Sequence, residues 1–247
     1  MKKFLPIILL FVGLLVVGGA IFFVTRNRNK DEEAVEDEVA LIDVSAENMP
    51  VVSLIPREDG HWLDMVITKL GKFDALTLDY EMLYKLPDGR TQGVPGTVRM
   101  DTVVDGTIKR ELLLGSESSG NFRYDEGVED GSITLRFRNE KGKLLAKFAS
   151  EFKLQDGSDE LKSVDGSVTF VPTETNTNYF VVMDTVGYPD TIPGDLERDP
   201  FGIFSSSAEE VPGEIRMDNL WRWNEAWESV QDYESPDVGA FVQTKSS

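Results

Sequence analysis

The sequence of 247 residues contains no cysteine and a single histidine, His61. Without thiols the chain forms no disulfide, uses no thiolate nucleophile and holds no cysteine-based zinc site. A Ser-His-Asp arrangement would have to use His61, and neither a G-x-S-x-G elbow nor a phosphate-binding glycine loop accompanies it. We therefore expect a protein that is not an enzyme.

Basic residues are also scarce beyond the N-terminus. Five of the 25 Lys and Arg residues and none of the 44 Asp and Glu residues lie in residues 1–30, so residues 31–247 carry a net charge of −24. A field of this sign repels phosphate backbones and anionic lipid headgroups. The composition therefore excludes nucleic acid as a partner.

The one long apolar run stands near the start of the chain. Residues 4–24 contain no charged side chain over 21 positions, and basic residues flank them on both sides. At about 1.5 Å per residue, such a helix spans roughly 31 Å, close to the hydrocarbon thickness of a bilayer. The run exceeds the apolar core of a cleaved signal peptide, and no A-x-A site follows it. We predict a transmembrane signal-anchor helix within residues 1–30, with residues 4–24 in the membrane.

The basic flanks do not decide the orientation, because they nearly balance. The short N-terminal tail favours a cytoplasmic N-terminus, so we predict a single-pass membrane protein whose C-terminal domain is extracytoplasmic. Residues 31–50 hold eight acidic and no basic residues. Like charges repel and extend a chain, which predicts a flexible acidic linker.

From residue 51 onward, apolar and polar residues alternate. Residues 76–86 place leucines, tyrosines and a methionine on one face and charged residues on the other, as a half-buried strand requires. Residues 133–138 and 144–154 repeat the pattern around a polar turn and predict a hairpin. Further predicted strands are residues 51–55, 62–70, 107–114, 167–171 and 179–186. The fold class is therefore all-β, with an antiparallel β-sandwich over residues 51–190 and a β extension over residues 191–247.

A tryptophan-rich segment, residues 218–231, permits an amphipathic helix or a β-hairpin. We prefer the hairpin because the surroundings are β and aromatic residues favour strands. Trp221, Trp223 and Trp227 are candidate binding residues, since exposed indoles stack on sugar rings or anchor partner proteins. Large aromatic residues rarely stay exposed together, so packing of the hairpin onto its neighbours is the preferred interpretation.

Two acidic turns offer the oxygen ligands that Ca²⁺ prefers. The candidate ligands are Asp125, Glu129, Asp130, Asp156 and Asp159. Neither turn has the spacing of an EF-hand, which needs a glutamate at its twelfth position. The sequence requires no cofactor, and calcium is the metal that it suggests.

The anchor, the acidic linker and the strand pattern of residues 51–190 resemble bacterial membrane-anchored surface proteins with an immunoglobulin-like or fibronectin-III-like β-sandwich. The Cys…Trp…Cys spacing of true immunoglobulin domains is absent. Residues 220–227 are similar to aromatic hairpins that close some bacterial surface and phage-tail domains. The resemblance implies a non-enzymatic surface interaction or structural module with a protein or glycan partner.

Two alternatives remain open. The first is a carbohydrate- or calcium-dependent binding domain that uses the acidic loops and the tryptophans. Such a domain could also be hydrolytic, because glycoside hydrolysis needs a pair of carboxyl groups. The second is an accessory subunit whose transmembrane helix docks with a larger membrane complex.

Overall fold

The computed structural model describes residues 44–70, 73–157 and 159–246. The predicted anchor, residues 4–24, and most of the predicted linker lie outside the described residues. Within those residues, no helix has the length and apolar character needed to cross a membrane. The described helical structure consists of two short 3-10 turns, η1 (Ala46–Asn48) and η2 (Met100–Thr102).

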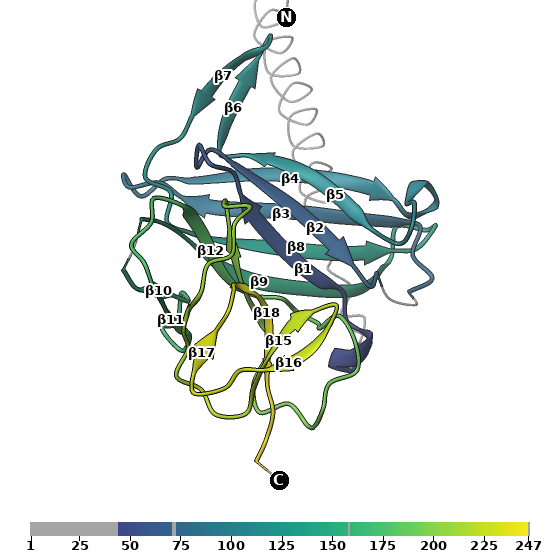
Figure 1. Cartoon of the computed structure of the whole chain (residues 1–247). Helices are drawn as coiled ribbons and strands as arrows, with labels where there is room; N and C mark the ends of the chain where they lie inside the picture. The colour runs from purple at the N-terminus through teal and green to yellow at the C-terminus, as the bar shows by residue number, and fades with distance from the viewer. Residues whose placement is uncertain (1–43, 71–72, 158, 247) are drawn as a thin grey trace, which may run out of the picture. The chain divides into compact units, whose positions relative to one another are not determined.

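Antiparallel strands build a large sheet that runs across the whole described domain (Figure 1). Within the described residues its strands follow in the order β16 (Ala226–Ser229), β15 (Leu220–Asn224), β18 (Gly239–Gln243), β13 (Phe201–Ser205), β12 (Tyr179–Asp184), β9 (Leu144–Asp156), β8 (Asp130–Arg138), β3 (Thr77–Lys85) and β4 (Thr91–Arg99).

Two further sheets pack against the large sheet. The covering sheet consists of β1 (Val51–Pro56), β2 (Trp62–Thr68) and β5 (Ile108–Leu113). The small sheet consists of β10 (Leu161–Lys162), β11 (Thr169–Pro172), β14 (Gly213–Glu214) and β17 (Glu234–Ser235). A separate hairpin of β6 (Gly115–Ser118) and β7 (Asn121–Tyr124) projects from the body, as Figure 1 shows.

Strand β12 is shared by two hydrophobic cores. Val181 and Met183 belong to the first core, which lies under the covering sheet. Phe180 and Val182 belong to the second core, together with Phe170 of the small sheet. Successive residues of a strand point to opposite faces. The covering sheet and the small sheet therefore lie on opposite faces of the large sheet, and β12 joins the layers.

The outer strands of the sheets are protected against further pairing. In β4, an edge strand of the large sheet, Pro95 lacks an N–H and interrupts the row of free donors. At β10, an edge of the small sheet, the Gln155 side chain accepts a hydrogen bond from the Lys162 N–H and donates one to its carbonyl, at 2.9 and 3.1 Å. Pro95 and the Gln155 side chain therefore limit the pairing of a further strand with β4 and with β10.

The all-β prediction is confirmed, and the layers form an antiparallel sandwich. All of the predicted strands are present, and so is the predicted hairpin of β8 and β9. Strands β4 and β13 were not predicted, because β4 is interrupted by Gly93, Pro95 and Gly96, and β13 is short and lacks alternation.

The tryptophan-rich segment is a hairpin, as preferred from the sequence: β15 pairs with β16 across Glu225, which has a φ of 59°. The sheet also continues across the predicted boundary at residue 190, because β12 pairs with β13. The β extension over residues 191–247 therefore contributes strands to the large sheet and side chains to the second core.

Candidate functional site

His61 has a structural environment. Its ring stacks on Tyr124 at 4.2 Å between centroids and 7° between planes. Its Nε2 lies 3.9 Å from a carboxylate oxygen of Glu126, and its side chain is 22% exposed. No hydroxyl group of the described residues hydrogen-bonds to this ring. The place of His61 in the sequence, after Asp59 and Gly60 and before a predicted strand, is typical of a solvated turn residue. Instead, the His61 ring packs on Tyr124 at the end of β7 and so links the projecting β6–β7 hairpin to the rest of the domain.

The structure brings three of the five predicted calcium ligands to one hollow. Asp125, Glu129 and Asp156 line a cavity of about 190 Å³ beside Glu126 and His61. The sequence alone did not place the two acidic turns next to each other. The other two candidates lie elsewhere: Asp159 accepts a 3.4 Å hydrogen bond from Thr175, and Asp130 has one buried oxygen with no hydrogen-bond partner in the described part of the chain.

The carboxylate of Asp125 is already engaged, because the Tyr84 hydroxyl donates a 2.8 Å hydrogen bond to it. Burial, then this bond and the Asp125 charge, raise the pKa of Tyr84 above its ordinary value. Across residues 44–70, 73–157 and 159–246, no group of three or more histidine and acidic side chains is arranged to hold a metal ion. Calcium binding stays a prediction that this geometry does not support.

The three tryptophans of the hairpin are all partly buried. Trp223 and Trp227 stand directly opposite each other and meet edge to face, with 5.1 Å between ring centroids. The indole N–H of Trp227 donates to the Asp190 carbonyl at 3.0 Å, and that of Trp221 donates to the Thr244 hydroxyl at 3.2 Å. These contacts favour packing over sugar stacking. The indole N–H groups of Trp221 and Trp227 already have hydrogen-bond acceptors within the domain, and the rings of Trp223 and Trp227 contact each other.

A cleft lies where the turn between β10 and β11 approaches the large sheet. Its volume is about 360 Å³, and its acidic lining residues are Glu151, Asp165 and Asp184. Hydrogen bonds from Ser163 and Ser167 lower the pKa of Asp165 to about 2. Desolvation in the cleft, followed by the nearby charge of Asp199, raises the pKa of Asp184. The cleft therefore holds two carboxyl groups whose affinities for a proton differ.

These two carboxyl groups are expected to affect stability with opposite signs. The folded-state pKa of Asp184 lies above its unfolded value, so its favourable contribution is present at low pH and is lost as the pH rises through the folded pKa. Asp184→Asn should therefore increase the free energy of unfolding at pH 7, by less than about 1 kcal/mol because the residue retains solvent contact. The gain should shrink as the pH falls through about 4, because the carboxyl group becomes protonated in both states.

Asp165→Asn is the matched control, because the depressed pKa of Asp165 makes its ionised form stabilising above the unfolded pKa. This variant should lose stability at pH 7. Urea unfolding at pH 7 and at pH 3.5 measures both effects. Equal shifts of the same sign in the two variants would contradict the assignment.

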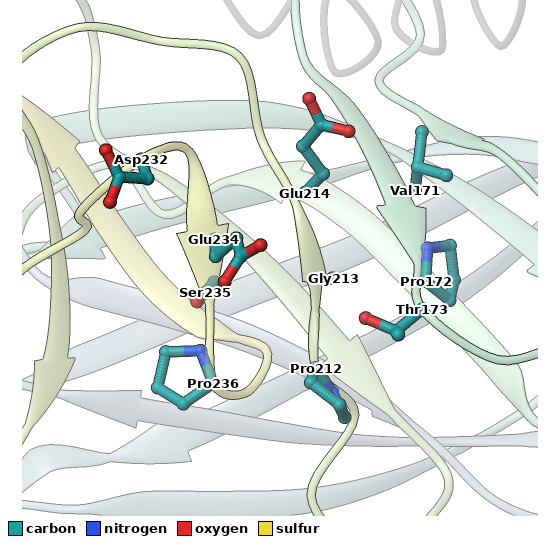
Figure 2. Close-up of a pocket in the computed structure, with 10 residues that line it drawn as sticks. All are labelled: Val171, Pro172, Thr173, Pro212, Gly213, Glu214, Asp232, Glu234, Ser235 and Pro236. Carbon is teal, nitrogen blue, oxygen red and sulfur yellow. The ribbon is translucent and has the colours of Figure 1, made fainter.

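A further hollow lies on the outer surface of the small sheet (Figure 2). We call it the sheet groove, and its volume is about 730 Å³. The residues around it come from β11, β14, β17 and the positions next to these strands: Val171, Pro172, Thr173, Pro212, Gly213, Glu214, Asp232, Glu234, Ser235 and Pro236. A second hollow of about 490 Å³ shares Val171 and Glu214 with the groove and continues it toward Arg216.

The floor of the sheet groove is held rigidly. On the inner side, Phe170 is fully buried in the second core and packs beneath β14. A Cβ at Gly213 would lie 2.3 Å from the Phe170 ring and 2.6 Å from the Val171 carbonyl oxygen. Only glycine allows β14 to approach β11 this closely, and the approach sets the spacing of the groove walls.

One rim of the groove is a tight turn in an unusual conformation. Asp232 and Tyr233 have φ values of 51° and 66°, and Gln231 bridges to Glu234 across them. Positive φ at both central residues defines a type I′ turn, which usually contains Asn and Gly. A tyrosine in this region is strained, and such strain gathers at functional sites. The turn carries Asp232 to the groove.

Comparisons of this chain with protein-family models, with curated proteins and with solved structures find no match. The sequence contained no local signal for the sheet groove, because its lining residues come from three separate segments of the chain, residues 171–173, 212–214 and 232–236.

Proposed function

We propose that this chain is a non-enzymatic, membrane-anchored interaction module. In this proposal residues 4–24 span the membrane, residues 31–50 hold the domain away from it, and the domain is an extracytoplasmic β-sandwich of the immunoglobulin-like kind. The length of the run and its lack of charged side chains support the anchor, and the thiol-labelling experiment below tests its orientation. The resemblance to bacterial surface proteins supports the class of function.

The sheet groove is the observation that carries the binding role. It is open, it is built on short paired strands, and its walls include three prolines, which lose little conformational entropy when a partner binds (Figure 2). Binding sites favour concave surfaces that are formed before the partner arrives. We therefore assign the groove as the binding surface of the module.

A hydrolytic domain is the second candidate. The observation that favours it is the cleft with Asp165 and Asp184, because carboxyl groups with pKa values shifted apart supply an acid and a base. The two carboxyl groups of a glycoside hydrolase carry out these roles. Loss of a glycan-cleaving activity in both Asp165→Asn and Asp184→Asn would favour this candidate over the interaction module.

The absence of cysteine allows a direct test of the anchor and the orientation. Glu140→Cys places one thiol on an exposed turn of the domain, and Lys2→Cys places one before the predicted span. A membrane-impermeant maleimide should label the thiol at position 140 in intact cells and the thiol at position 2 only after permeabilisation. Labelling in the reverse order would place the domain in the cytoplasm and overturn the proposal.

A further inference from the structure

The sheet groove has an excess of negative charge. Glu214, Asp232 and Glu234 line it, and no Lys or Arg side chain is among its lining residues. Glu214 is paired with Arg216, which lines the adjoining hollow. Asp232 and Glu234 have no side-chain hydrogen bond or ion pair with any described residue. Two carboxylates of the groove are therefore free to accept a cationic ligand.

The groove also offers few hydrogen-bond donors. Its three prolines have no N–H, and the Thr173 N–H already donates to the Pro212 carbonyl at 2.9 Å. The Ser235 hydroxyl donates to the Asp237 carbonyl at 2.7 Å. Apart from the Thr173 hydroxyl, what remains is mainly a set of acceptors and apolar surface, including Val171, which is 40% exposed. Such a lining fits a ligand that is rich in donors.

Lysine and arginine side chains combine the required features. Their charged ends donate several hydrogen bonds, and their aliphatic stems pack on apolar surface such as proline rings. The groove and its continuation, about 730 and 490 Å³, exceed the volume of a single side chain. A second copy of this domain is a poor occupant, because residues 31–247 carry a net charge of −24.

We propose that the sheet groove binds an extended segment of a partner protein that presents two or more arginine or lysine side chains. The ammonium or guanidinium groups pair with Asp232 and Glu234, and the aliphatic stems lie on Val171 and the proline rings. This inference rests on the proposed function, because it names the partner chemistry of the same surface.

The test compares three probes on the full chain in lipid nanodiscs: the peptide (Arg-Ser)₄, the neutral peptide (Gln-Ser)₄ and the free polyamine spermine. The test variant is Asp232→Asn with Glu234→Gln, which keeps the size of both side chains, and asparagine also tolerates the positive φ at position 232. The control is Glu117→Gln with Glu140→Gln, which makes the same change in net charge on exposed residues that do not line the groove.

Fluorescence anisotropy should show that wild-type protein binds (Arg-Ser)₄ and not (Gln-Ser)₄. The affinity for (Arg-Ser)₄ should fall at least ~10-fold in the groove variant and less than ~3-fold in the control variant. Val171→Arg, which places a cation in the groove, should also abolish binding. Unchanged unfolding midpoints verify that the variants are folded.

Three results would overturn the proposal. Equal losses in the groove and control variants would show attraction to the overall charge alone. Spermine that binds as tightly as the peptide, and depends on the same carboxylates, would make the site a polyamine site. Absence of peptide binding would exclude a cationic segment as the occupant. None of these results changes the thiol-labelling outcome, so failure of this inference is distinct from failure of the membrane-anchored topology.

Discussion

Replacing Phe180 by alanine is expected to lower the free energy of unfolding by about 3–5 kcal/mol. Phe180 is fully buried on β12 and packs in the second core with Phe170, Phe201 and Phe241. Truncation removes apolar contact and leaves a cavity that the surrounding strands fill only in part, because β9 and β13 hold β12 on both sides. Since β12 also carries Val181 into the first core, the loss should reach both layers.

Urea unfolding followed by tryptophan emission measures this effect. Trp62 lies in the covering sheet, whereas the other tryptophans lie in the hairpin of β15 and β16. A variant that keeps only Trp62 therefore reports on unfolding of the covering sheet, and a variant that keeps only the hairpin tryptophans reports on unfolding of the hairpin. The two reporters should shift together in Phe180→Ala. Phe122→Ala is the control: its side chain is 45% exposed, and it should lose no more than ~1 kcal/mol. A shift confined to the hairpin reporter would contradict the coupling through β12.

Arg222→Ala should give the second largest loss, about 2–3 kcal/mol. Arg222 lies on β15 and is 7% exposed. It donates a 3.1 Å hydrogen bond to Glu228, and it lies 3.9 Å from Asp237. Removal of one partner from a buried ion pair leaves the remaining charge poorly solvated. Both carboxylates keep some solvent contact, which places the loss below that of a fully buried pair.

The same substitution should also weaken binding in the sheet groove. Asp237 follows Pro236 of the groove wall, and its carboxylate accepts the Val211 N–H at 2.8 Å. Arg222 therefore stabilises the loop that positions this wall. Arg222→Met keeps the volume and should lose less stability than alanine, whereas Arg222→Lys should retain the charge without the forked geometry. If Arg222→Ala binds (Arg-Ser)₄ as tightly as wild type, this link between Arg222 and the groove is wrong.

The sequence predicted those parts of the fold that depend on local alternation. Strand β3 shows this well: Leu78, Met82 and Tyr84 fall on one face, and all three are buried. Strand β4 was missed because an edge strand needs little hydrophobic pattern, and its glycines and Pro95 are typical of a loop. Of the small sheet, only β11 was predicted; β10, β14 and β17 are two residues long, too short for a period to be recognised.

The candidate sites also divide into those that local sequence predicts and those that depend on pairing between distant strands. The hairpin that carries Trp223 and Trp227 was predicted correctly, because aromatic residues and β surroundings favour strands. The direct pairing of the two residues depends on the register across Glu225. The meeting of Asp125 with Asp156 could not be predicted, because it depends on how β8 and β9 pair and on where β12 begins. The sheet groove depends on pairings between segments separated by tens of residues.

By itself, the sequence determined the fold class of the described domain. Its lack of cysteine excludes thiol chemistry, its acidity predicts that nucleic acid is not a partner, its long apolar run predicts an anchor, and its alternation specifies antiparallel strands. Each of these properties follows from residue type or from a period of a few residues. Tertiary structure alone decided that β12 divides two cores, that the covering sheet and the small sheet occupy opposite faces, and that Asp232 and Glu234 line the groove with three prolines. Those features depend on which distant strands pair and in which register. The alternation within one strand is compatible with many partner strands, so it does not determine the pairing before the whole sheet is packed.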